Sequence, residues 1–308
     1  MDLNGFNIVS DYKISIVTPV FNGGSYLEET ILSVINQGYP NLEYIIIDGG
    51  STDGTVDIIK KYEKHLAYWV SEPDNGLYHA VQKGFEKSTG DIMAWINSDD
   101  MYHRGAFSIV SELFNQFPQI EWMMGIPSIY DELGRTVMVD GYKPWCKGNL
   151  YMGNYGIDNW IQQESSFWRR SLWEKSGSSL RLDLKYAADF ELWLRFFRYA
   201  ELYSLKSLLS GFRFRSHNQI SMDNKEAYME EVHQSISEEV DQLPESYRRK
   251  MNEVKYFNER MNSIKSRVYR SIYFRQNIKR IMQHKKELFK YPPRIGFDRV
   301  TQKFLMSE

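Results

Sequence analysis

Two adjacent carboxylates are the first candidates for chemistry in this sequence. Asp99 and Asp100 directly follow the apolar stretch "MAWIN" and a serine. Neighbouring carboxylates repel each other unless a cation or a shared proton relieves them. Mg²⁺ and Mn²⁺ bind one or two carboxylates together with phosphate oxygens, so the pair predicts a divalent-metal site for a nucleotide diphosphate. A helix cap followed by a first-turn acid is the alternative, and the pair alone does not separate the two.

Another acid, Asp48, ends the apolar stretch "EYIIID" and enters the loop "GGSTDGT". One interpretation is a turn carboxylate that accepts hydrogen bonds from the amides after it. The other is an acceptor that faces a ligand, with Gly49 and Gly50 leaving room for a ring or phosphate against the backbone. The loop is not a P-loop, because the required glycine and lysine spacing is absent.

Three further residues have two open interpretations each. Asp189 precedes an apolar helical pattern in "AADFELWLRF". It is either a helix cap or a carboxylate whose pKa lies near the working pH, so that it accepts a proton. His217 by itself is more typical of a surface histidine than of a metal ligand. Arg215, like its neighbour Arg213, is a solvated charge or part of a clamp on a diphosphate.

The elements that must position these residues alternate along the first hundred residues. Apolar runs at 14–20, 43–48, 67–73 and 91–100 are separated by helical patterns, the first of which, at 25–38, begins with Ser25 and Glu28 in capping-box spacing. This alternation predicts an α/β protein with a mostly parallel sheet covered by helices on both faces. Ligands bind beyond the carboxyl ends of such strands, so we expect the polar strand ends to converge there, namely Asn22, Asp48, Glu72 and residues 97–100.

The second half of the chain changes character. We expect a strand at 121–126, helices at 165–177 and 187–200, and a boundary near residue 221 that separates a catalytic domain, 1–220, from a helical C-terminal region, 221–308. Residues 248–290 contain 14 Lys/Arg and 3 Glu, so this segment carries +11 in a chain whose net charge is −2. An anionic partner is therefore expected for the tail.

The tail also predicts an amphipathic helix, with Val254, Phe257, Met261, Ile264, Val268 and Ile272 spaced three or four apart. Such a helix either lies on an anionic lipid surface or docks on the catalytic domain or a second subunit. Both interpretations are open, and a homo-oligomer belongs to the second. No nucleic-acid recognition module accompanies the charge, so we expect no nucleic-acid partner.

Composition restricts the cellular setting. A single cysteine, Cys146, excludes an intramolecular disulfide framework and fits a reducing compartment. The first residues lack a basic segment followed by an apolar one, and no run of about 18 apolar residues occurs. We therefore expect a cytoplasmic protein that does not span the membrane, at most peripheral at its inner face.

Four ordered blocks resemble family 2 glycosyltransferases, which have the GT-A fold. They are "SIVTPVFNGGSYLEETILSVINQGYPNLEYIIIDGGSTDGT", "SEPDNGLYHAVQKGFEKSTGDIMAWINSDD", "QQESSFWRRSLWEKSG" and "YAADFELWLR", within residues 12–220. The resemblance implies metal-dependent transfer of a sugar, usually with inversion, from a nucleotide-diphosphate donor to a glycan or lipid-linked acceptor. The cation is Mn²⁺ or Mg²⁺, and the donor base is often uracil.

The resemblance also assigns residues. It places Thr18, Pro19 and Asn22 at the nucleoside, Asp48 and Gly49 at the base, and Asp99 and Asp100 in the metal and ribose motif. Asp189 is the implied general base. Our candidate donor site therefore also includes Asn97, Arg169 and Arg215, the candidate metal ligands are Asp99, Asp100 and His217, and the cleft block contributes Gln163, Glu164 and Arg170.

This sequence departs from the family pattern at several positions. The usual Asp-Asp-Gly-Ser is Asp48-Gly49-Gly50-Ser51, Asn97 replaces a frequent Asp, and His79 and Gln82 stand where Asp and Asn are common. Two rival functions fit the sequence less well. A nucleotidyltransferase would require a Lys-rich loop after the first strand, which "TPVFNGGSY" lacks, and a non-catalytic carbohydrate-binding protein would explain the aromatic residues but not the acids.

Overall fold

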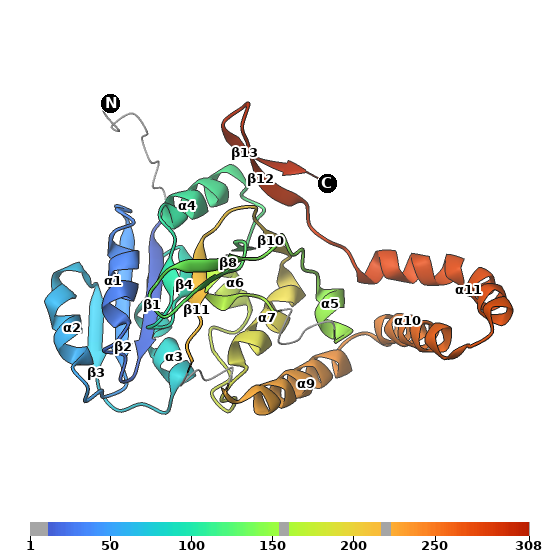
Figure 1. Ribbon diagram of the computed structural model, residues 1–308, viewed down its shortest axis with the longest axis horizontal. Coiled ribbons are helices and arrows are strands. Elements are labelled where there is room, and N and C mark those ends of the chain that lie inside the picture. The colour runs from blue at the N-terminus through green and yellow to red at the C-terminus, as the bar shows by residue number, and fades with distance from the viewer. Residues whose placement is uncertain (1–11, 154–159, 217–222, 308) are drawn as a thin grey trace.

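The computed structural model describes residues 12–153, 160–216 and 223–307. Its main sheet has the strand order β10-β6-β9-β4-β1-β2-β3, and β9 alone is antiparallel to its neighbours. Figure 1 shows this sheet at the centre of the catalytic part. Its strands are β1 (Ile14–Val20), β2 (Leu42–Asp48), β3 (Tyr68–Ser71), β4 (Ile92–Trp95), β6 (Trp122–Met124), β9 (Ser166–Arg169) and β10 (Leu202–Ser204).

Helices cover both faces of this sheet because successive residues of each buried strand point to opposite faces. On β2, Tyr44 and Ile46 belong to one apolar cluster, while Ile45 and Ile47 belong to the other. The predicted α/β architecture is therefore confirmed. The covering helices are α1 (Leu27–Ile35), α2 (Thr55–Tyr62), α3 (Leu77–Lys87), α4 (Ala106–Gln116), α5 (Lys147–Tyr151), α6 (Arg170–Lys175) and α7 (Ala188–Tyr199).

A smaller sheet lies beside the main one, in the strand order β5-β11-β7-β8. Its strand β5 begins directly after the acid pair, and β11 pairs with it in antiparallel orientation. This pairing brings the end of β11 next to Asp100. The strands are β5 (Met101–Tyr102), β7 (Ser128–Tyr130), β8 (Thr136–Val139) and β11 (Ser210–Arg213), and the short 3-10 turns are η1 (Glu63–His65) and η2 (Gln163–Ser165).

Two local expectations were wrong. Residues 166–169, expected within a helix, form strand β9, because their buried side chains fill the gap between β4 and β6. The capping box at Ser25 and Glu28 is not formed: α1 begins at Leu27 without a side-chain cap, and the Glu28 carboxylate instead pairs with Lys61 Nζ at 2.5 Å.

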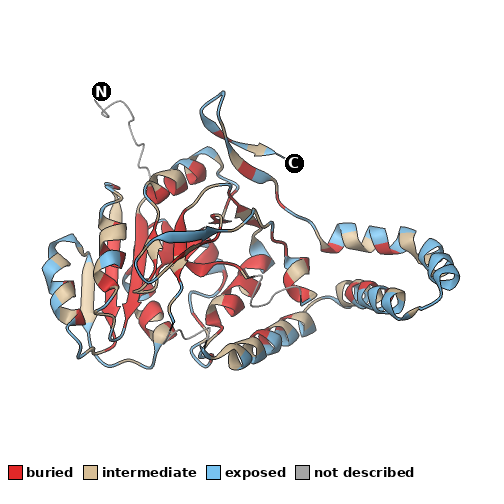
Figure 2. Cartoon of the chain, viewed as in Figure 1, coloured by how far each residue is buried: buried red, intermediate tan, exposed pale blue. Residues whose placement is uncertain are grey.

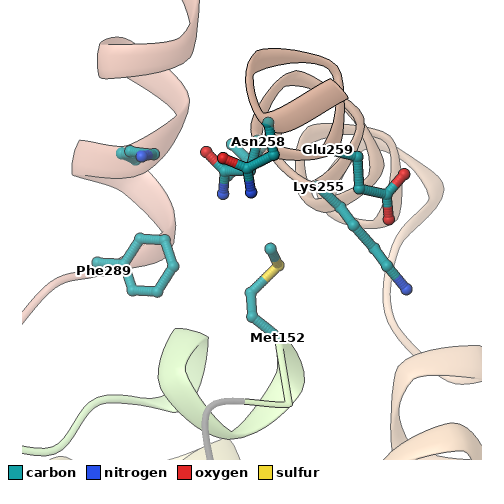
Figure 3. Close-up of a pocket in the computed structure, with 8 residues that line it drawn as sticks. Met152, Lys255, Asn258, Glu259 and Phe289 are labelled. Carbon is teal, nitrogen blue, oxygen red and sulfur yellow. The ribbon is translucent and has the colours of Figure 1, made fainter. Parts of the chain in front are cut away.

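Within residues 223–307, the described part of the C-terminal region, three long helices are followed by a β-hairpin. Helices α10 and α11 form an antiparallel pair that projects from the catalytic part (Figure 1). Near the base of this pair, Met152 lies between α10 and Phe289 in a groove of about 510 Å³ (Figure 3). The elements are α9 (Lys225–Asp241), α10 (Glu245–Ser263), α11 (Arg267–Leu288), β12 (Arg294–Asp298) and β13 (Lys303–Ser307).

The single amphipathic helix expected in the tail is interrupted, because α10 ends at Ser263 and α11 starts at Arg267. Val254 and Phe257 are buried in the same apolar cluster as the main sheet, whereas Val268 is 68% exposed. The first part of the stripe therefore docks on protein and the last part does not. The predicted boundary at 220/221 falls outside the described residues, and among the residues described no helix is long and apolar enough to cross a bilayer.

Candidate active site

The carboxyl ends of four parallel strands meet at one edge of the main sheet. Val20 is in register with Asp48, Asp48 with Ser71, and Val17 with Trp95. The loops that follow β1, β2, β3 and β4 therefore leave the sheet side by side. They carry the expected polar residues, Asn22, Asp48, Glu72 and Asn97 to Asp100.

The loops after β1 and β2 are joined by hydrogen bonds. Asn22, whose φ is 50°, accepts the Thr52 amide through Oδ1 at 3.0 Å, and its own amide donates to Ser51 Oγ at 2.7 Å. The Gly24 amide donates to Asp53 Oδ2 at 2.9 Å. Asn22 is exposed at the strand edge, so it remains available to a ligand while it fixes the spacing of the two loops.

The structure corrects the interpretation of Asp48 as a ligand-facing acceptor. Its side chain is fully buried, and its carboxylate accepts the amides of Gly50 and Ser51 and the hydroxyls of Ser51 and Ser71 at 2.5–3.1 Å. The other interpretation, a turn carboxylate, describes this geometry. Gly49 likewise leaves room for a protein group, since a Cβ there would lie 2.9 Å from Asp74 Oδ2.

The acid pair sits in a turn held from the second sheet. The amide of Arg213 donates to Asp100 Oδ1 at 2.8 Å, and its Nε donates to the carbonyl of Asp99 at 2.6 Å. Arg215 forms an ion pair with Asp99 Oδ2 at 2.8 Å. Arg213 is fully buried and pairs with Glu29, so it supports the turn and is not a clamp for an incoming diphosphate. Arg215, about one quarter exposed, remains in reach of the site.

A buried glutamate connects the acid pair with Asp189. Glu164 in η2 is 4% exposed, and burial, with the charges of Asp99 and Asp189, raises its pKa to about 8. Burial, Asp99 and Glu164 also raise the pKa of Asp100 well above its usual range. Glu164 therefore lies close enough to both Asp99 and Asp189 for their charges to interact. The neighbouring Gln163 donates to the carbonyl of Trp95 at 2.6 Å and so anchors η2 to the end of β4.

Asp189 lies in the first turn of α7, and burial raises its pKa to about 6. Its Oδ1 is 3.1 Å from the hydroxyl of Tyr78 on α3, which is also 2.8 Å from the carbonyl of Tyr186. A carboxyl group that is half protonated near pH 6 is ionised at neutral pH yet remains a competent proton acceptor. The catalytic role predicted for Asp189 thus has a physical basis in its burial.

The residues present fit a divalent cation. Asp100 Oδ2, Asn97 Oδ1 and Glu164 Oε1 are buried without a hydrogen-bond partner among the described residues, and a cation at Asp100 would satisfy its oxygen. In the same part of the chain, no group of three or more His, Cys, Asp or Glu side chains could hold a metal alone. Mg²⁺ and Mn²⁺ prefer one or two carboxylates completed by phosphate oxygens, so the acid pair would suit either cation without a third protein carboxylate. His217, the other predicted ligand, lies outside the described residues.

Four expected donor or cleft residues do not face this edge. Thr18 and Pro19 are buried within β1, and Thr18 Oγ1 contacts the hydroxyl of Tyr44 at 3.1 Å. Arg169 pairs with Ile92, the first residue of β4, and therefore lies at the opposite edge of the sheet. There it donates to the carbonyls of Phe114 and Ile120, while the adjacent Arg170 donates to that of Gly90. Their roles are structural.

Sequence reasoning did not find the partners of Asp189. Tyr78 looked like one apolar residue of an amphipathic helix, and Glu231 like one acid in a charged tail. Glu231 on α9 accepts the amides of Lys185, Tyr186 and Ala187 at 2.8–2.9 Å, directly before α7. Only the fold brings these residues together, because 42 positions or more separate each of them from Asp189.

A largely parallel sheet with acids beyond its carboxyl edge defines an α/β enzyme whose ligand enters at that edge. The family model "Glycosyl transferase family 2" matches residues 15–175, which is more than half of the 308 residues. The chain therefore belongs to glycosyl transferase family 2, whose members are sugar-transferring enzymes.

Relatives and solved structures agree with this assignment. An uncharacterized glycosyltransferase of Mycobacterium tuberculosis is 32% identical over 203 residues, 65% of this chain and 74% of that protein. The putative teichuronic acid biosynthesis glycosyltransferase TuaG of Bacillus subtilis is 32% identical over 139 residues, 44% of this chain. The match spans only 51% of TuaG, and 60% of an uncharacterized glycosyltransferase of Rickettsia typhi. The crystal structure of S. aureus TarS 1–349 with UDP-GlcNAc has a TM-score of 0.63 at 16% identity, covering 90% of this chain and 80% of that TarS 1–349 chain, so the GT-A fold is shared.

Proposed function

We propose that this chain transfers a sugar from a nucleotide-diphosphate donor, a UDP-sugar, to a hydroxyl group of a glycan or lipid-linked glycan, with inversion and with Mn²⁺ or Mg²⁺. The observation that carries the proposal is the grouping of Asp189, Glu164 and the pair Asp99/Asp100 at the carboxyl edge of the sheet. The choice of UDP is supported by TarS, a protein of the same fold that is described with UDP-GlcNAc and with UDP.

The residues of the chain divide the reaction between them. Direct transfer passes through an oxocarbenium-like state, with positive charge on the sugar and negative charge on the departing diphosphate. Asp189 accepts the proton of the acceptor hydroxyl as that oxygen attacks. Arg215, beside Asp99, contributes positive charge near the diphosphate. A divalent cation, when bound by Asp99 and Asp100, supplies further positive charge for the same leaving group.

The aromatic residues argue against the non-catalytic rival. That rival required tryptophans exposed for stacking on sugars, yet Trp95, Trp122, Trp145, Trp168 and Trp193 are all less than 2% exposed. Trp193 stacks on Trp95 and Trp122, with ring centroids 5.9 and 5.1 Å apart. These rings form the core that supports β4 and α7.

The experiment is a screen of nucleotide sugars for metal-dependent release of nucleotide diphosphate. We expect release with at least one UDP-sugar, loss of release with a chelator, and recovery with Mn²⁺ or Mg²⁺. Asp100→Asn should lose release, because a neutral amide holds a cation poorly. Asp57→Asn, an exposed acid on α2, is the matched control and should behave as wild type. Release that persists in Asp100→Asn, or that ignores the chelator, contradicts the metal role.

A further inference from the structure

The outer half of the α10–α11 pair exposes apolar and basic side chains together. Val268 is 68% exposed, Tyr269 71% and Ile272 47%, and all three lie in the first turns of α11. The α10–α11 pair projects from the catalytic part, and its outer end is mostly exposed (Figure 2). Exposed apolar residues that occur singly need no explanation, but three within five residues at a projecting end do. We call residues 260–276 the tip.

Helix α11 carries apolar residues on two faces. Tyr273, Ile281 and Leu288 are at least partly buried and belong to the apolar cluster shared with α10 and the catalytic part. Val268 and Ile272, four residues apart, lie on the other face, and Arg275 and Lys279 continue it at the spacing of a helix. One face is thus covered by protein, while the other presents apolar and basic residues to solvent.

The charge of this region is of one sign. No Asp or Glu occurs between Glu259 and Glu287, whereas nine Lys or Arg do. Arg280 pairs with Glu253, but Lys265, Arg267 and Arg275 are exposed and form no ion pair in the described part of the chain. Two basic residues, Arg267 and Arg270, even occupy the first turn of α11, where the helix dipole favours an anion.

A cleft of about 490 Å³ lies at the turn between the two helices. It is lined by basic, hydroxyl and apolar side chains, among them Arg260, Ser263, Lys265, Ser266, Tyr269 and Ile272. Guanidinium, ammonium and hydroxyl groups donate hydrogen bonds to phosphate oxygens, and the apolar side chains beside them suit hydrocarbon. A phosphate-bearing lipid headgroup has both of these properties.

We infer that the tip, residues 260–276, is a contact site for an anionic lipid surface. Basic clusters on a helix attract anionic headgroups, and exposed aliphatic and aromatic side chains enter the interface beside them. A second copy of the tip would meet its own positive charge. Nucleic acid would satisfy the charge but leave Val268 and Ile272 in water. This inference does not depend on the proposed reaction, since it concerns a surface far along the chain from the acid site.

The base of the same pair provides an internal contrast. Its groove, which includes Lys255, Lys285 and Glu259 with Asn258 and Phe289, has charges of both signs and packs near α5 (Figure 3). The base therefore serves docking on the catalytic part. The inference assigns lipid contact to the tip and not to the whole segment 248–290.

The test is flotation of the full chain with vesicles of phosphatidylcholine, alone or mixed with phosphatidylglycerol. We expect flotation only with the anionic vesicles, and release as salt rises, because a Debye length near 10 Å at about 0.1 M screens the charges. Replacing Lys265, Arg267 and Arg275 together by Gln should weaken vesicle binding about 100-fold, since each basic residue near an anionic surface contributes severalfold. Val268→Asn with Ile272→Asn should weaken it as well.

The matched control removes three exposed basic residues elsewhere, as Lys60→Gln, Lys64→Gln and Arg104→Gln, and should float as wild type does. The inference is overturned by absence of flotation at low salt, by equal loss in the control, or by unchanged flotation of both tip variants. Concentration-dependent dimers or RNA binding that require the tip, without flotation, would also overturn it in favour of a second copy or a nucleic acid. Release of nucleotide diphosphate from the donor is measured in a separate assay, so lipid contact at the tip and the proposed reaction can each be contradicted independently.

Discussion

At the scale of single residues, the site depends on burial that changes proton affinity. Asp189 and Glu164 are both carboxyl groups, yet burial raises the pKa of Asp189 to about 6 and that of Glu164 to about 8. At neutral pH Asp189 is mostly ionised, whereas Glu164 is mostly protonated. Of these two acids, Asp189 therefore has the protonation state that the proposed proton acceptor requires at neutral pH.

Asp189→Asn should lower kcat for transfer by about 10²- to 10⁴-fold, because the amide cannot accept the acceptor's proton. Donor binding, measured by titration calorimetry, should change little. At pH 8 the free energy of unfolding of this variant should be no lower than that of wild type. Above pH 6 the wild-type Asp189 is ionised in the folded state, and because its pKa there is raised, this ionisation costs the folded protein on the order of 3 kcal/mol. That cost disappears at low pH.

Asp183→Asn is the control for this variant, because Asp183 is an exposed acid six residues earlier that pairs with Arg181. Its transfer rate should equal that of wild type. Full transfer by Asp189→Asn would remove Asp189 from the role of general base.

The pH profile gives a second residue-scale prediction. At pH values below about 6, kcat/KM for transfer should decrease, because Asp189 becomes protonated. The hydroxyl of Tyr78 lowers the pKa of Asp189 by hydrogen bonding, so Tyr78→Phe should move this acid limb to higher pH. An acid limb that stays in place while the rate falls would mean that Tyr78 supports packing only.

At the scale of elements, helix α9 holds the segment that leads into α7. The carboxylate of Glu231 accepts three successive amides, those of residues 185–187, directly before α7. An acceptor from a distant helix thus holds the segment that enters α7, a helix without a side-chain cap of its own. The C-terminal region therefore helps to position Asp189.

Glu231→Gln should destabilise the protein by about 1–3 kcal/mol, because an amide cannot accept all three bonds and leaves at least one of these backbone donors without its acceptor. Hydrogen exchange at residues 185–189 should accelerate, and kcat should fall more than KM rises. Glu230→Gln, the exposed neighbour on α9, is the control and should be neutral. Unchanged exchange in Glu231→Gln would contradict the role of α9 in holding this segment.

At the scale of the whole molecule, one apolar cluster unites the catalytic and C-terminal regions. Val232, Met251, Val254 and Phe257 are buried with Trp193 in the same cluster. The division of the chain at 220/221 remains a prediction, but the parts before and after it share one apolar core. We therefore expect the catalytic region to need the C-terminal helices for stability.

Phe257→Ala should lower the free energy of unfolding by about 3–5 kcal/mol, because it leaves a cavity where the buried Phe257 ring stacks on Tyr273 of α11. Tyr256→Ala, at the preceding position, should change the free energy of unfolding by less than about 0.5 kcal/mol, since Tyr256 is 62% exposed. Denaturant unfolding of both variants measures the difference. Equal, small effects would mean that Phe257 does not contribute to the shared core.

The sequence by itself determined the alternation of strands and helices and the grouping of polar strand ends. These features follow from local rules: buried strands read as apolar runs, helices as periodic ones, and the carboxyl ends of parallel strands share an edge. That is why β1 to β4 and the position of the acid pair after β4 could be predicted. The resemblance of four ordered blocks added the family and the predicted role of Asp189.

Tertiary structure decided what each polar residue contacts. Asp48 and Arg169 were predicted to contact a ligand. The carboxylate of Asp48 instead accepts hydrogen bonds from its own turn, and Arg169 lies at the opposite edge of the sheet, because β9 is antiparallel to its neighbours. The partners Tyr78 and Glu231 reach Asp189 only through the packing of α3 and α9. Side-chain contacts and burial depend on residues distant in sequence, and no local pattern records them.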